Sequence, residues 1–106
     1  MPSGSDKEYT VTIQDPALDM LLQHTRFLAQ VSESAAVRLT EDFFREAKTL
    51  ESMPERCPWL IDPMIPEYKY RKLIFGKYYM LIFQINGDQV FIDAMLDCRQ
   101  DYTHLL

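Results

Sequence analysis

The sequence predicts an α+β fold in which an antiparallel helical hairpin packs on a four-stranded, mainly antiparallel sheet. The second half of the chain contains three runs rich in Ile, Leu, Phe and Tyr, separated by Gly76 and by Asn86-Gly87-Asp88. Such runs between glycine turns are typical of consecutive antiparallel strands. The first half contains two segments with apolar residues at steps of three and four, which is the spacing of a helix with one buried face. A short alternating run before them predicts a fourth strand.

The opening strand is expected over residues 8–13, where Tyr9, Val11 and Ile13 share one face. Because a lone strand is unstable in water, this strand must join the sheet at an edge. Residues 1–7 are small and polar and are expected to form a disordered tail. A chain of 106 residues corresponds to one domain, which would cover residues 8–106.

Two helices follow, and each has its own start signal. Asp15-Pro16 predicts the start of the first helix, because aspartate caps free N–H groups and proline suits the first helical position. This helix is expected to run to about Val31, and Ser32 or Ser34 is expected to cap the second. The short link between them makes an antiparallel hairpin. The expected buried stripes are Leu18, Leu21, Leu22, Thr25 and Leu28 in the first helix and Ala36, Leu39, Phe43, Ala47 and Leu50 in the second.

Four prolines between residues 54 and 66 end the second helix and predict an ordered loop that carries Trp59, Leu60 and Ile61 over the core. The strands of the meander are then expected over residues 69–75, 77–85 and 89–96. The Asn-Gly pair is a hairpin signal, since both central residues of that turn adopt positive φ. A short polar tail, residues 97–106, follows the last strand.

Composition and charge limit the classes of function. The net charge of -5 argues against a generic nucleic-acid binder, although Lys69, Arg71, Lys72 and Lys77 gather at the start of the meander. The two cysteines have neither disulfide-framework nor metal-site spacing. The N-terminus lacks a signal-peptide pattern, and no run approaches the roughly 18 apolar residues of a membrane span. We therefore expect a cytoplasmic protein without a membrane partner.

Several short stretches stand in a recognisable order. An opening strand leads into Asp15-Pro16, and the second helix ends in residues 50–56 (LESMPER). Further along are residues 70–73 (YRKL), 76–79 (GKYY) and 97–102 (DCRQDY). This order and spacing resemble the RelE/ParE superfamily, the toxins of bacterial type II toxin–antitoxin and plasmid-stabilisation modules. The resemblance covers nearly the whole chain, from Tyr9 to Leu106.

The resemblance implies a growth inhibitor that is neutralised by a cognate antitoxin. Some members cleave mRNA on the ribosome as metal-independent endoribonucleases, and others poison DNA gyrase, so the resemblance leaves open whether this chain is an enzyme. It implies neither a cofactor nor a metal. The antitoxin is expected in a groove between the hairpin and the sheet, near Met20 and Phe44. The alternative is a catalytically inactive, toxin-like binding protein that keeps only the antitoxin interface. The acidic charge and Tyr79, where many members carry arginine, motivate this alternative.

The resemblance also implies a candidate site of four residues. Arg71 matches an arginine on the first meander strand, and Lys69 lies two residues away, on the same face of a strand. Arg99 matches a tail arginine, and Tyr102 matches the aromatic residue that follows it. Guanidinium and ammonium groups suit the charge that builds on a phosphate during RNA cleavage. Three of the four also have a structural interpretation: Arg71 pairs with a nearby acid, Arg99 holds the tail against Asp97 or Asp101, and Tyr102 packs.

Overall fold

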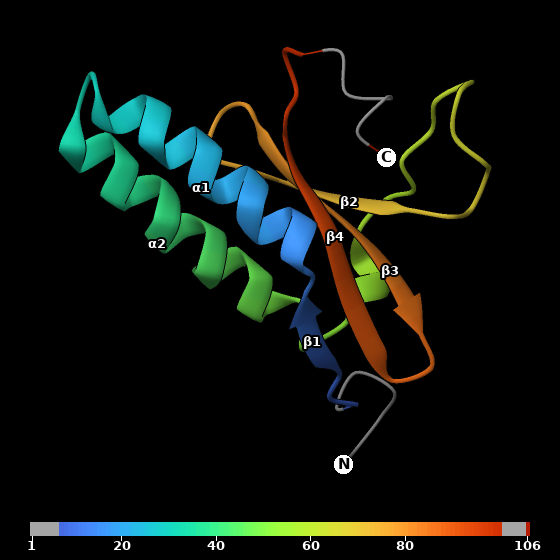
Figure 1. Cartoon of the computed structure of the whole chain (residues 1–106). Helices are drawn as coiled ribbons and strands as arrows, with labels where there is room; N and C mark the ends of the chain where they lie inside the picture. Colours follow the sequence, from blue (N-terminus) through green and yellow to red (C-terminus); the bar gives the residue numbers. More distant parts are fainter. Residues whose placement is uncertain (1–6, 101–105) are drawn as a thin grey trace.

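The computed structural model describes residues 7–100 and Leu106, and it has the predicted α+β architecture (Figure 1). The expected disordered tail, residues 1–7, lies outside the described residues except for Lys7. The elements in chain order are β1 (Thr10–Ile13), α1 (Asp15–Ala29), α2 (Glu33–Thr49), a short 3-10 helix (Pro54–Arg56), β2 (Arg71–Phe75), β3 (Tyr79–Asn86) and β4 (Gln89–Asp97). The two helices lie side by side on one face of the sheet.

The sheet has the strand order β1-β4-β3-β2. Strands β2, β3 and β4 form an antiparallel meander, and β1 joins at the edge, parallel to β4, with Thr10 opposite Gln89. The four-stranded, mainly antiparallel sheet and the edge position of β1 are therefore confirmed. The β3–β4 turn differs in detail from the prediction. Asn86 pairs with Gln89, so the two central residues are Gly87 and Asp88, and of these only Gly87 has a positive φ, 64°.

The helix ends follow local capping rules with one exception. Ser32 caps α2 as predicted, because its hydroxyl oxygen accepts a hydrogen bond from the Ala35 backbone N–H at 3.2 Å. Asp15 does not cap α1. Gln14 occupies that position without a side-chain bond, and Asp15 lies in the first turn. An aspartate there still stabilises the helix through the helix dipole.

The core is divided between the two faces of the sheet. On the helix side, the predicted α2 stripe is buried against Leu81, Phe83 and Ile92, with Phe43 fully enclosed. The other face carries Met80 and Ile82 and is covered by Leu60 and Ile65 of the proline-rich loop. The loop therefore covers the core as expected. Ile61 was wrongly included, since it is 85% exposed.

The buried stripe of α1 was predicted correctly at Leu21 and Leu28 and wrongly at two other leucines. Leu18 and Leu22 are 37% and 46% exposed, whereas Ala17 and Leu21 are buried. Helix α1 packs against both α2 and β4. Its buried face includes the small side chain of Ala17 together with Leu21, so Leu18 and Leu22, one position further on, lie at the flank of this face. Neither described helix is long and apolar enough to cross a membrane.

The proline-rich loop also protects the exposed edge of β2. The Leu60 N–H donates to the Tyr70 carbonyl oxygen at 2.7 Å, and the Lys72 N–H donates to the Pro58 carbonyl oxygen at 3.0 Å. An uncovered edge strand is a template for unwanted pairing with other chains. The loop pairs with the start of this edge, while its prolines prevent it from becoming a full strand.

Candidate functional site

Arg71 stands at the first position of β2 and is bonded to the proline-rich loop. Its Nη1 donates to the carbonyl oxygens of Cys57 at 2.7 Å and of Glu55 at 3.2 Å. Its guanidinium carbon lies 3.9 Å from the centroid of the Trp59 ring, a cation–π contact. The sequence suggested an acidic partner for Arg71, but the bonds go to backbone carbonyl oxygens. Arg71 thus joins the start of β2 to the segment that follows α2.

Lys69 lies before the first residue of β2 and is exposed, so it is not on a strand face as expected. Its Nζ is 5.1 Å from the centroid of the Tyr70 ring. Lys69 and Arg71 nevertheless line one open cavity of about 550 Å³. The same cavity is lined by the acidic side chains of Glu55 and Glu67. The local charge is therefore mixed, which weakens the cavity as a phosphate site.

Arg99 lies just beyond β4 and is held by Asp97. The guanidinium donates from Nε to Asp97 Oδ1 at 3.0 Å and from Nη2 to Oδ2 at 2.6 Å, and the Arg99 backbone N–H also donates to Oδ1. These hydrogen bonds hold the pKa of the buried Asp97 carboxyl below its usual value, and they raise the pKa of Arg99. The guanidinium also stacks 3.8 Å from the Tyr78 ring centroid. Arg99 therefore holds the chain against Asp97, as one of the interpretations expected.

His24 on α1 and Tyr79 on β3 adjoin this ion pair. Their rings meet edge to face, with centroids 5.7 Å apart. Burial lowers the pKa of His24, and the Asp97 carboxylate opposes this only in part. Burial also raises the pKa of the Tyr79 hydroxyl. Both side chains are thus neutral near pH 7, and this end of the sheet combines a compensated ion pair with an uncharged imidazole.

A groove runs beside these residues, between α1 and the end of β4. Its volume is about 310 Å³, and it is lined by Met20, Gln23, His24, Phe27, Met95, Leu96 and Gln100. The sequence placed a partner groove between hairpin and sheet near Met20, and Met20 does line this groove. Phe44 does not line it. That residue lies on α2 and is 47% exposed.

The structure does not bring Arg71 and Arg99 together. Arg71 is opposite Phe83, whereas Phe75, at the other end of β2, is opposite Tyr79, which in turn is opposite Asp97. The two sites are therefore four residue steps apart along β2, which corresponds to about 13 Å. Tyr102 lies outside the described residues. Within residues 7–100 and Leu106, no three His, Cys, Asp or Glu side chains form a possible metal site.

Two contacts were not foreseen from the sequence. His24 adjoins Tyr79 and the Asp97–Arg99 pair because of the register in which α1 packs, and no local pattern reports that register. Trp59 was expected only to cover the core, yet its ring contacts Arg71. The only sequence feature that could have indicated this contact is that aromatic and basic residues occur together in this part of the chain.

No protein-family model matches the chain, and no curated protein matches it in sequence. A solved structure described as the chromosomal ParDE TA (toxin–antitoxin) system from P. aeruginosa matches it with a TM-score of 0.68 at 13% sequence identity. The match covers 90% of this chain and 98% of that chain. The chain thus has a RelE/ParE-like fold, which confirms the fold implied by the resemblance.

Proposed function

We propose that this chain is the toxin-like component of a type II toxin–antitoxin module and that a partner antitoxin neutralises it. The observation that carries this proposal is the fold likeness, which extends over nearly the whole of both chains. A partial match would be consistent with a shared motif. A match over 90% of this chain and 98% of the other favours a shared kind of role, although a fold alone does not specify function.

The antitoxin site in this proposal is the groove between α1 and β4. Met20, Phe27, Met95 and Leu96 give it apolar walls, and Phe27 is 67% exposed. Exposed apolar surface of this kind is typical of protein-binding sites. Gln23, His24 and Gln100 supply polar groups at the same place. An apolar side chain of the antitoxin would fill the groove while its backbone bonds to these polar groups.

For the cellular target, we favour inhibition of a protein, such as DNA gyrase, over cleavage of mRNA. Cleavage requires cationic groups gathered around one phosphate. Arg71 and Arg99 are each bonded to other groups of the chain, and they lie at opposite ends of β2. The second candidate is an inactive, toxin-like binding protein. The net charge of -5 and the packing of Tyr79 against His24 favour it.

Co-expression with the neighbouring upstream reading frame tests the partner. We expect the two proteins to copurify and induction of this chain alone to stop growth. Phe27→Glu should abolish copurification, because a carboxylate would be buried in the groove. Val31→Glu is the matched control, since Val31 is 81% exposed and does not line the groove. Separate elution of the two unmodified proteins at micromolar concentration contradicts the partner proposal.

The target is tested with purified protein in a gyrase supercoiling assay and by mapping mRNA 5′ ends after induction. Inhibited supercoiling with intact mRNA supports the favoured mechanism. If mRNA is cut instead, Arg71→Lys and Arg99→Lys should each reduce cutting by roughly 10²-fold in protein that circular dichroism shows to be folded, because lysine does not reproduce the bidentate grip on phosphate. If induction of this chain alone does not affect growth and the chain still copurifies with its partner, the result supports the inactive binding protein.

A further inference from the structure

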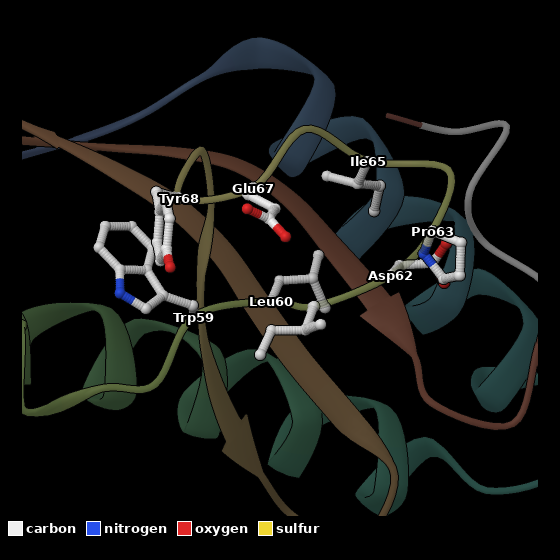
Figure 2. Close-up of a pocket in the computed structure, with 8 residues that line it drawn as sticks. Trp59, Leu60, Asp62, Pro63, Ile65, Glu67 and Tyr68 are labelled. Carbon is white, nitrogen blue, oxygen red and sulfur yellow. The ribbon is translucent and has the colours of Figure 1, made fainter.

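The proline-rich loop encloses a cavity that none of the functions above uses. It has a volume of about 300 Å³ and lies within residues 59–68 (Figure 2). Cavities of this size hold small ligands or a single side chain. Leu60 and Ile65 line it and are themselves buried in the second core, at 2% and 7% exposure. The cavity therefore has a wall that is fixed to the sheet, although the loop itself is at the surface.

Two aromatic rings form one end of this cavity. Trp59 and Tyr68 meet edge to face, with ring centroids 5.5 Å apart, and Figure 2 shows them side by side. Tyr68 is 71% exposed, so burial in the core does not account for its position. The Trp59 ring already attracts one cation, the Arg71 guanidinium. Trp59, Glu67 and Tyr68 line both this cavity and the neighbouring one, whereas Arg71 lines only the neighbouring cavity.

The charged groups of the cavity are both acidic. Asp62 and Glu67 line it, and no Lys or Arg is among its described lining residues. Figure 2 shows the Glu67 carboxylate pointing toward Leu60, into the space between the aromatic rings and Ile65. Asp62 Oδ1 accepts the Met64 backbone N–H at 2.8 Å, which holds that carboxylate in a fixed place. An anionic ligand such as phosphate would be repelled here.

We propose that this cavity binds an organic cation, an ammonium or guanidinium group on a short apolar stem. The exposed Tyr68 ring attracts such a cation electrostatically, and the two carboxylates compensate its charge. The apolar wall of Leu60 and Ile65 accommodates the stem. The net charge of -5 adds a general attraction for cations. A free small amine and a lysine or arginine side chain of a peptide share this chemistry. The proposal does not depend on the toxin role.

The experiment uses Trp59, which is the only tryptophan of the chain and lines the cavity. The full chain is titrated with choline and, separately, with its neutral isostere 3,3-dimethylbutan-1-ol, and the fluorescence of Trp59 is followed. We expect saturable binding of choline and at least roughly 10-fold weaker binding of the neutral compound, because only the cation gains from the rings and carboxylates. A third titration with a short Lys- and Arg-containing peptide distinguishes a peptide ligand from a free amine.

Variants locate the binding. Glu67→Gln should weaken choline binding by roughly 5- to 10-fold, since it removes one of two opposite charges. Asp19→Asn, an exposed change on α1 with the same loss of charge, should leave it unchanged. Chemical shifts of the Trp59 indole N–H provide a second readout that does not depend on fluorescence. Equal binding of the two isosteres, equal effects of the two variants, or no saturable change in either readout would overturn the proposal.

Discussion

Replacing Arg71 by alanine tests whether this side chain is primarily a structural tie between the proline-rich loop and the sheet. The change removes the two hydrogen bonds to the carbonyl oxygens of Cys57 and Glu55, together with the stack on Trp59. It leaves the backbone of β2 intact. The carbonyl oxygen of Cys57 would then lose a charged donor in a partly buried place, where water replaces it poorly.

The expected loss of unfolding free energy follows from these contacts. The short, partly buried bond to Cys57 contributes about 1.5–2 kcal/mol as a bond from a charged donor. The longer, exposed bond to Glu55 contributes about 0.5 kcal/mol. The contact with Trp59 adds about 0.5–1 kcal/mol. We expect a total of about 2.5–3.5 kcal/mol, which corresponds to a decrease in Tm of roughly 10–14 °C for a domain of this size.

Urea unfolding followed by circular dichroism measures this change, with Arg45→Ala as the matched control. Arg45 pairs with Asp42 on the exposed surface of α2, so its removal should cost less than about 0.5 kcal/mol. Arg71→Lys should be intermediate, because lysine can donate to a carbonyl but lacks the planar group that stacks on Trp59. An Arg71→Ala protein within about 0.5 kcal/mol of the parent would refute the structural role.

Two further predictions concern the core and the end of the sheet. Phe43→Ala should lower the free energy of unfolding in urea by about 3–5 kcal/mol, because the side chain is fully buried. Phe44→Ala, one position further on, should lower it by less than about 1.5 kcal/mol, because Phe44 is partly exposed. Equal losses in the two variants would contradict the assigned helix register. The hydrogen bonds from Arg99 hold the folded-state pKa of Asp97 below its usual value of 3.8, so their stabilisation is present above that value and is lost as the pH falls below it. Asp97→Asn should therefore be less stable than the parent at pH 7, and the difference should shrink between about pH 5 and pH 2. A pH-independent difference would contradict the assignment.

Signals that act over a few residues were enough to predict the elements. The strands of the meander lie within two residues of their predicted bounds at either end. Ser32 caps α2, and the stripe from Ala36 to Leu50 is buried. Capping, glycine turns and helical periodicity involve groups that are neighbours in the chain, so local sequence specifies them. The same reason explains the Asp97–Arg99 pair, which was among the expected alternatives and spans only two residues.

Packing between distant elements decided the rest. Leu18 and Leu22 were wrongly included in the buried face of α1, because periodicity alone does not show that the smaller Ala17 is buried in their place. The partners of Arg71 lie 14 and 16 residues away and are backbone carbonyl oxygens, which carry no residue-type signal. Sequence by itself determined the α+β elements of this protein and their order. Only the tertiary structure determined the partners of Arg71, since a long charged side chain bonds to whichever acceptor the path of the loop brings within reach.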